Sequence, residues 1–224
     1  HAVADGLRRK LLGYAAEMTG HTPAALTIAP TAQGDAVVFV RNPESVVVTL
    51  HDLAMDSFYN KDRGGQLSAE ASFKTRQNPP SFGGCFAEVE VDIDLCKVRI
   101  THILNVHDAG VIINPALATA QVHGGMSMGL GYGLSEEFLY NDAGRPLNDN
   151  LLDYKIPTAM DTPDLNVEFI QLEDPTGPYG NKSLGEPPAI PVAPALRNAV
   201  LHATGVAMDT IPMTPQRLIE AFQA

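Results

Sequence analysis

The sequence predicts an α+β fold, in which antiparallel hairpins and sheets pack against helices. Two neighbouring segments, 86–94 and 97–103, alternate apolar and polar side chains with a period of two residues. Two others, 2–18 and 191–204, place apolar residues at helical spacing. Hydrophobic residues make up 45% of the chain, the usual share for a globular protein, so a core can form.

The clearest strand signal is the run CFAEVEVDID followed by CKVRITHIL. Apolar side chains alternate with Glu and Asp in the first run, and nearly alternate with Lys, Arg and Thr in the second. A turn around Asp94-Leu95 joins the two runs. We therefore expect an antiparallel hairpin with one buried face, in which the acidic strand pairs with the basic one.

Elements on either side of this hairpin follow from local signals. Thr49-Leu-His-Asp52 has capping-box spacing and predicts a helix through Tyr59. The glycine-rich run 119–133 predicts a buried helix that comes close to its neighbours, since so many glycines disfavour an isolated helix. The helix over 2–18 ends near Gly20, and Gly205 follows the helix over 191–204. Strands are expected at Ala36–Val40, Val46–Val48, Ala69–Thr75 and Leu165–Leu172, and a last helix runs from Thr214 through Phe222.

Length and charge limit the classes of function. The 224 residues suffice for one large domain or for two lobes, 1–80 and 81–224. The net charge of −11 argues against binding to nucleic acid or to an anionic membrane surface. No apolar run reaches transmembrane length, and two cysteines form no disulfide framework, so a cytoplasmic protein is expected. Because a helical pattern begins at once after His1, we expect a fragment of a longer protein.

The strongest chemical signal is the segment Asn181-Lys-Ser-Leu-Gly-Glu-Pro-Pro188, which leads into the helix over 191–204. Pro187 favours an extended backbone at Glu186, and Gly185 permits a turn or a close approach just before it. A rigidly held, ionised carboxylate is what a general base requires. From these residues alone, however, a glutamate that merely complements the helix dipole, worth about 0.3–1 kcal/mol, is the simpler interpretation.

A resemblance changes this balance. The string GEPPAIPVAPALRNAVLHATG resembles the signature that closes the molybdenum-binding subunit of the xanthine dehydrogenase family of molybdenum hydroxylases. In that family the Gly-Glu-Pro-Pro glutamate stands next to the molybdenum and acts as the catalytic base. The resemblance therefore implies that Glu186 is the base, with Gly185 as its cofactor-binding neighbour.

A second match lies upstream, in Asn114-Pro-Ala-Leu-Ala-Thr-Ala-Gln-Val-His-Gly-Gly125. It resembles the family's Asn-Pro…Gly-Gln-Val-x-Gly segment, whose glutamine hydrogen-bonds the pterin of the cofactor. Gln121 occupies that place, and an amide that both donates and accepts suits a pterin edge. Without the resemblance, Gln121 is an ordinary glutamine near a helix start. We expect Gln121 and Glu186 to converge on one cleft, each at the start of a helix.

The resemblance implies a C-terminal part of a cofactor-binding subunit that hydroxylates an N-heteroaromatic substrate, a purine such as xanthine or hypoxanthine, with oxygen from water. The cofactor is molybdopterin or its cytosine dinucleotide form. FAD and [2Fe–2S] clusters, and the family's other cofactor loops, belong to other domains or subunits or to upstream sequence. The alternatives are a sister enzyme acting on nicotinate, an aldehyde or carbon monoxide, and a non-catalytic truncated module for assembly.

Other chemical candidates are weaker. The spacing of His102, His107 and His123 matches no standard zinc pattern, so no metal ligands are predicted. Cys85 and Cys96 are expected to be free thiols rather than a bridge across the hairpin. The chain also lacks the Gly-x-Ser-x-Gly context of a serine hydrolase and the glycine fingerprint of a dinucleotide-binding fold.

Overall fold

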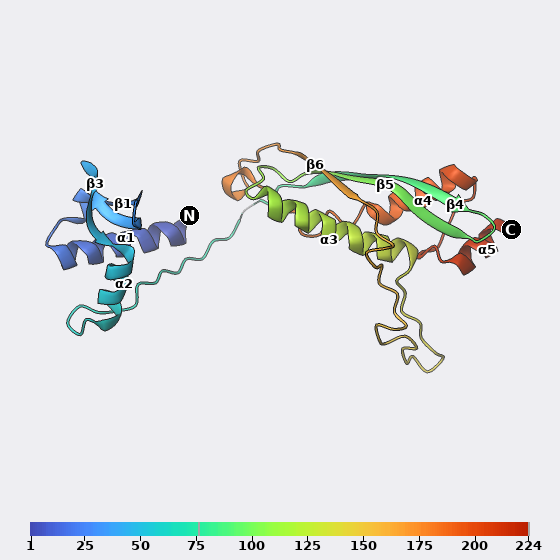
Figure 1. Cartoon of the computed structure of the whole chain (residues 1–224), viewed down its shortest axis with the longest axis horizontal. Helices are drawn as coiled ribbons and strands as arrows, with labels where there is room; N and C mark the ends of the chain where they lie inside the picture. The colour runs from blue at the N-terminus through green and yellow to red at the C-terminus, as the bar shows by residue number, and fades with distance from the viewer. Residues whose placement is uncertain (76, 224) are drawn as a thin grey trace. The chain divides into compact units, whose positions relative to one another are not determined.

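The computed structural model describes residues 1–75 and 77–223, which form two compact units, His1–Lys74 and Thr75–Ala224. Each unit has its own three-stranded sheet and its own apolar core (Figure 1). The chain is therefore mixed α and β, as predicted. Within the described residues, no helix combines the length and the apolar character that crossing a bilayer would require.

The first unit packs two helices against an antiparallel sheet of order β1-β2-β3. The predicted helix over 2–18 is confirmed, and it ends at Gly20, whose φ of 74° is left-handed. Strand β1 was not predicted, because it contains Pro30; a proline is tolerated there since β1 is an edge strand. The elements are α1 (Ala2–Thr19), η1 (Pro23–Ala25), β1 (Leu26–Thr31), β2 (Gly34–Phe39), β3 (Asn42–Thr49) and α2 (Leu50–Tyr59).

The start of α2 was predicted correctly, whereas the strand expected at Ala69–Thr75 is wrong. The Thr49 hydroxyl caps α2 by accepting a 3.0 Å hydrogen bond from the Asp52 amide. In contrast, the described part of the chain offers no strand that pairs with 69–75, and Phe73 is 88% exposed. Alternation alone does not make a strand where no partner and no core face are available.

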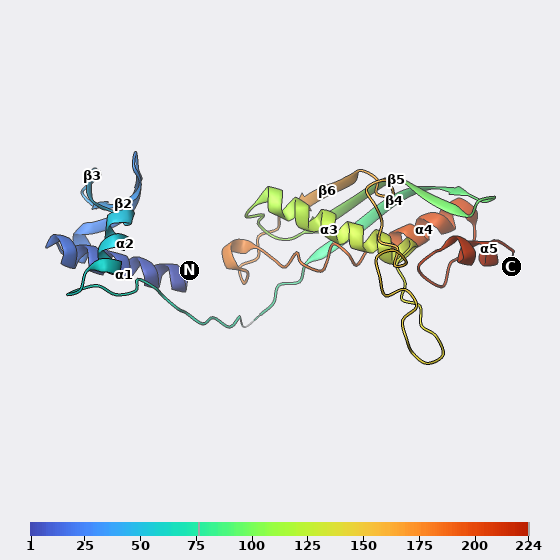
Figure 2. The ribbon, with the colours of Figure 1, turned by 60° about the horizontal axis from the view of Figure 1, so that its bottom comes forward.

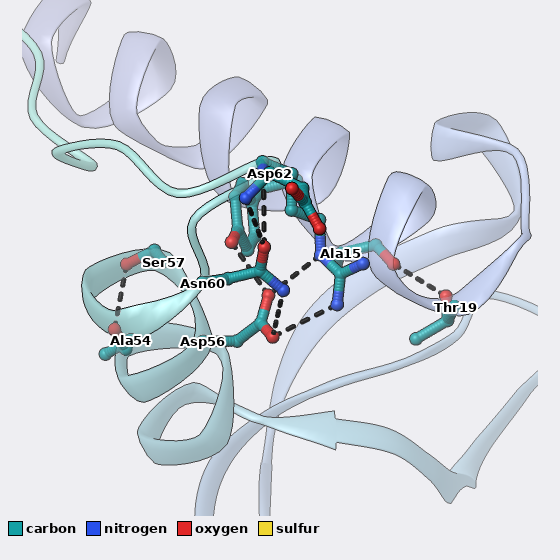
Figure 3. A network of polar contacts seen from close by, with 9 residues as sticks. Ala15, Thr19, Ala54, Asp56, Ser57, Asn60 and Asp62 are labelled. Carbon is teal, nitrogen blue, oxygen red and sulfur yellow. Dashed lines mark hydrogen bonds and ion pairs between the residues drawn. The ribbon is translucent and has the colours of Figure 1, made fainter.

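A polar network around Asp56 joins the two helices of the first unit to the loop after α2 (Figure 3). The Tyr14 hydroxyl donates to Asp56 over 2.7 Å, and the Arg63 guanidinium donates to both carboxylate oxygens over 2.9 and 3.0 Å. These hydrogen bonds, that of Arg63 first, hold the pKa of Asp56 below its usual value. Asn60 adds a further contact to Asp56 and accepts from the Asp62 amide.

The second unit is built on the predicted hairpin, now seen as β4 and β5 in a sheet of order β4-β5-β6. Opposite charges face one another in it, and Arg99 forms an ion pair with Glu90. A bulge after Glu88 leaves Thr101 without a partner in the register, which explains why the second run only nearly alternates. The elements are β4 (Phe82–Asp92), β5 (Lys97–Asp108), α3 (Pro115–Leu134), β6 (Leu165–Ile170), η2 (Pro178–Gly180), α4 (Val192–Thr204) and α5 (Pro215–Gln223).

Strand β6 departs from the antiparallel expectation because it pairs parallel to β5. A parallel neighbour requires a long crossover, and here the crossover contains all of α3 (Figures 1 and 2). A turn-rich segment, residues 135–164, completes this connection. At its base the buried Asn148 donates to the Glu137 carbonyl over 2.6 Å and accepts from the Leu139 amide over 2.9 Å.

Glycines let α3 lie almost against the backbone that leads into α4. A methyl group added at Gly129 would come within 2.5 Å of the Val192 side chain, and one at Gly125 within 2.6 Å of Pro188. Gly133, one turn further on, faces Leu196 and Ala193. This glycine face, defined as Gly125, Gly129 and Gly133, confirms that the glycine-rich helix is in close contact with its neighbours. The core beside it includes Ile103, Met126, Leu130 and Leu196.

We predict that Gly129→Ala lowers the thermal unfolding midpoint of the protein, since overpacking of a tight contact costs about 1–3 kcal/mol. Gly124→Ala is the matched control, because Gly124 lies in the same helix, is exposed, and has no atom within 4 Å of an added methyl group. There the alanine should be neutral or stabilising, by about 0.5–1 kcal/mol. Equal midpoints for the two variants would contradict the close helix packing.

Candidate functional site

The predicted site residues lie on and around one irregular segment, the Glu186 loop, defined as residues 181–191. It runs from the end of η2 to the start of α4. Its first residues are hydrogen-bonded to the residues that come directly after β5. Asn181 forms an isolated antiparallel bridge with Gly110, and the Lys182 amide donates to the Ala109 carbonyl over 2.8 Å. The Ser81 hydroxyl donates to the Ser183 carbonyl over 2.5 Å. The loop is thus attached from both the strand end and the segment before β4.

A buried ion pair strengthens this attachment. Lys182 Nζ lies 2.6 Å from Asp108 Oδ2, and the two side chains are only 7% and 6% exposed. The other Asp108 oxygen accepts from the amides of Gly110 and Leu172 over 3.1 and 3.4 Å. Burial, the largest single influence, raises the pKa of Asp108, but the hydrogen bonds from Lys182 and the two amides together lower it overall. Asp108 therefore remains an ionised anchor at neutral pH.

Gln121 contacts the Glu186 loop directly. Its Nε2 donates to the Gly185 carbonyl over 3.0 Å, although the two residues are 64 positions apart in the chain. Gln121 does not lie at a helix start as expected, because α3 begins earlier, at Pro115, with Asn114 as its cap. The structure thus brings Gln121, Gly185 and, next to it, Glu186 into one neighbourhood.

A further contact was not anticipated from the sequence. Asn105, which is fully buried on β5, donates from Nδ2 to the Pro188 carbonyl over 2.9 Å. It follows Ile103 by two residues and so lies on the same, core-facing side of the strand. The signal that could have revealed it is the placing of Asn105 and His107 at positions where the alternation of β5 calls for apolar side chains.

The Glu186 side chain is exposed, and its carboxylate makes no hydrogen bond or ion pair with the residues that the structure describes. Its carbonyl accepts from the Ala189 amide over 3.1 Å, which closes a turn. It is not in the first turn of α4, since that helix begins at Val192 with Pro191 as N-cap, so the expected support from the helix dipole falls short of it. The arrangement combines a free carboxylate with a backbone held from several sides, which suits proton transfer.

Gly185 is exposed, and a methyl group added to it would meet no atom of the described residues within 4 Å. Its φ is not positive either, so contacts inside this chain do not require glycine at this position. Space over its backbone remains open beside Gln121.

The remaining candidate groups are not assembled for chemistry. Within the described chain, no three His, Cys, Asp or Glu residues cluster as a metal would need. Burial lowers the pKa of His107, which is 1% exposed, so its ring is neutral. Cys85 and Cys96 are free thiols, as predicted, and burial raises the pKa of Cys85 to about 11, which keeps it protonated and unreactive.

A groove of about 790 Å³ lies beside α3 and α4, next to the end of the Glu186 loop. It does not include Gln121, Gly185 or Glu186 among its lining residues, and all three of these residues are exposed. Its lining is largely apolar and includes Met128, Tyr132, Ala189, Ile190, Ala193 and Pro194.

We predict that Lys182→Met destabilises the protein by about 3–5 kcal/mol at neutral pH, because it leaves the Asp108 carboxylate buried without its partner. The lowered pKa of Asp108 makes its contribution fully present above the unfolded-state value of about 3.9. That contribution disappears as the pH falls through the folded-state pKa, so the difference between wild type and variant should shrink in acid. Denaturant unfolding at several pH values measures this.

Lys97→Met, which removes an exposed lysine from the strand that carries Asp108, is the control and should change little. A Lys182→Met penalty no larger than this control, or one that grows in acid, would contradict the role of the ion pair.

Comparison with known proteins places this geometry in a family. A family model described as a molybdopterin cofactor-binding domain matches residues 1–163, a range that includes Gln121 but ends before the Glu186 loop. The xanthine dehydrogenase molybdenum-binding subunit of Escherichia coli O157:H7 is 53% identical over 217 residues, which are 96% of this chain and 28% of that protein. The aldehyde oxidoreductase molybdenum-binding subunit PaoC of the same strain is 35% identical over 164 residues, 70% of this chain and 22% of that one.

The fold agrees with these relatives. Quinoline 2-oxidoreductase from Pseudomonas putida 86 superposes with a TM-score of 0.72 and 25% identity, covering 98% of this chain and 28% of that one. The chain thus spans 28% of the length of the xanthine dehydrogenase subunit and of the quinoline enzyme, and 22% of the length of PaoC. It belongs to the molybdopterin cofactor-binding domain family and corresponds to part of a xanthine dehydrogenase-type molybdenum-binding subunit.

Proposed function

We propose that this chain supplies the catalytic base and part of the cofactor site of an enzyme that hydroxylates an N-heteroaromatic ring, a purine such as xanthine or hypoxanthine, with water as the oxygen source. The observation that carries the proposal is the 3.0 Å contact between Gln121 Nε2 and the Gly185 carbonyl. It unites the two segments that resemble the family's pterin-binding and base-bearing motifs.

The exposed residues suit the molybdenum cofactor, as molybdopterin or its cytosine dinucleotide form. Gln121 uses only one N–H for the Gly185 carbonyl, and its amide oxygen has no partner in the described chain. One donor and one acceptor thus remain for a pterin edge, which presents both kinds of group. The open backbone of Gly185, and of Gly124 one turn beyond Gln121, leaves room for a flat ligand at close range.

When bound, the cofactor would supply the oxidising power of the reaction, because it would take up the hydrogen and the two electrons of the ring C–H bond that breaks. Glu186 accepts the proton that the water-derived oxygen loses before it bonds to an electron-poor ring carbon. A carboxylate with no partner among the described residues is available for that proton. The several attachments of the Glu186 loop fix its backbone, so the carboxylate needs little reorganisation before it reacts.

Other parts of the enzyme are required. Gln121 and the Glu186 loop present one open surface, so the upstream part of the subunit completes the pocket. A [2Fe–2S] cluster takes four ligands, usually cysteines, and this chain has only Cys85 and Cys96, both free. The clusters and FAD that carry electrons away therefore belong to other domains or subunits, and the much greater length of the relatives supports this.

The second candidate is a sister enzyme that acts on an aldehyde, nicotinate or carbon monoxide. Two similarities support this candidate. PaoC is 35% identical to the chain, and carbon monoxide dehydrogenase from Oligotropha carboxidovorans superposes on it with a TM-score of 0.68. The greater identity to the xanthine dehydrogenase subunit, 53%, favours the purine. A non-catalytic assembly module is the third, and turnover of any of these substrates by the intact enzyme excludes it.

We predict that Glu186→Gln in the intact enzyme keeps full molybdenum content but lowers turnover of xanthine or hypoxanthine about 10²–10⁴-fold, because the amide cannot accept the proton. Steady-state kinetics with metal analysis of the same preparation measures both quantities. Glu168→Gln, at an exposed position on β6 outside the Glu186 loop, should leave both unchanged. Normal turnover in fully loaded Glu186→Gln enzyme would refute the assignment.

We also predict that the 224-residue chain alone does not retain the cofactor through purification, because Gln121 and the Glu186 loop contact a pterin from one side only. Metal analysis of the purified chain tests this. Stoichiometric molybdenum would show that the chain encloses the cofactor by itself, against the expectation.

A further inference from the structure

Amide side chains hold the backbone before and after Glu186, at the carbonyls of Gly185 and Pro188. Gln121 donates to the Gly185 carbonyl over 3.0 Å, and Asn105 donates to the Pro188 carbonyl over 2.9 Å. Between them, the Ala189 amide closes a turn onto the Glu186 carbonyl over 3.1 Å. Gln121 comes from α3 and Asn105 from β5, so the two hold the loop from different elements.

The two residues that follow Glu186 limit how this part of the loop can be held. Pro187 and Pro188 have no N–H, so this stretch can offer its neighbours only carbonyl oxygens. A strand such as β5 cannot pair with it in the ordinary way. The buried side-chain amide of Asn105 instead donates to the Pro188 carbonyl.

Stability alone does not account for Asn105. It is 0% exposed, and its Oδ1 has no hydrogen-bond partner among the described residues. Burying an amide oxygen without a partner costs stability, whereas a leucine on this face of β5 would continue the core of Ile103. The function of Asn105 therefore lies in the hydrogen bond that its amide donates to the Pro188 carbonyl.

We propose that Asn105 is a positioning residue for the reaction, which acts through the Pro188 carbonyl to fix the place of the Glu186 carboxylate. This inference rests on the proposed role of Glu186 as the base. Gln121 fixes the other side of the same short segment in addition to its contact with the cofactor. Gly125 supports the hydrogen bonds of Gln121 and Asn105 to the loop, because its missing side chain lets α3 approach Pro188 and Ala189 closely.

The test is Asn105→Leu in the intact, cofactor-loaded enzyme. A shift of about 1 Å in a reacting group can reduce the rate about a hundredfold, so we expect kcat to fall about ten- to a hundredfold. KM and molybdenum content should stay near their wild-type values, because Asn105 touches neither substrate nor cofactor. Asn148→Leu is the matched control: it removes another buried asparagine that bonds to backbone, at the base of the segment over 135–164, and should leave kcat unchanged.

A double-mutant cycle with Glu186→Gln separates positioning from general damage. Single-turnover reduction of the enzyme by substrate, followed over hours, makes the slow variants measurable. If Asn105 acts through Glu186, Asn105→Leu should add no further loss in the Glu186→Gln background. The inference would be overturned if the rate losses of the two substitutions multiplied in the double variant, or if kcat were unchanged in the single Asn105→Leu variant.

The outcomes also separate this inference from the proposed function. Full activity in Glu186→Gln would refute the role of the base, whatever Asn105→Leu does. A nearly inactive Glu186→Gln with a normal Asn105→Leu would refute only the positioning role. If the leucine variant fails to assemble, Asn105→Ser replaces it in the same cycle, since serine keeps a shorter donor; it should show a smaller, equally non-additive loss, and a multiplying loss would overturn the inference.

Discussion

The close approach of α3 to the segment Pro188–Leu196 is the constraint on which the second unit depends. It is possible only because Gly125, Gly129 and Gly133 present no side chains at that contact. The same approach forms the core between α3, α4 and the sheet, and it brings Gln121 within hydrogen-bonding distance of the Gly185 carbonyl. Packing and site geometry therefore share one cause, so a methyl group on this face would disturb both.

The Glu186 loop is irregular, and side chains rather than a strand ladder hold it. A loop without regular structure must satisfy its backbone groups individually, and its prolines lower the number of donors that it can offer. The buried pair of Lys182 and Asp108 fixes its beginning, and Gln121 and Asn105 hold its middle. Glu186 projects from this braced segment with its carboxylate free of partners in the described chain, so rigidity and availability are combined at one residue.

Local patterns in the sequence predicted the regular elements where each signal was complete in itself. The β4–β5 hairpin followed from alternation, the start of α2 from Thr49, and the end of α1 from Gly20. Contacts between distant positions carry no such local mark. Asp108 and Lys182 are 74 residues apart, and Asn105 looks like an interruption in an apolar strand until the Pro188 carbonyl is seen beside it. Strand β1 was not predicted because its Pro30 is a residue that normally argues against a strand.

The candidate site was predicted in part. Glu186, Gln121 and Gly185 were selected by resemblance to a family, since elementary chemistry alone could not distinguish Glu186 from an ordinary surface glutamate. The structure adds the contact between Gln121 and Gly185, and shows that the proximity does not depend on two helix starts, because Gln121 lies well inside α3. The catalytic and cofactor-binding roles of these residues remain proposals.

We propose that the Glu186 loop, held by Lys182, Gln121 and Asn105, presents the Glu186 carboxylate to the molybdenum. A crystal structure of the intact, cofactor-loaded enzyme tests it most directly. We expect the Glu186 carboxylate to lie within hydrogen-bonding reach of the molybdenum's ligands and the Gln121 amide to lie beside the pterin. The hydrogen bonds to the Gly185 and Pro188 carbonyls should be retained. A Glu186 side chain directed away from the metal, or a cofactor bound on a face remote from Gln121, would contradict it.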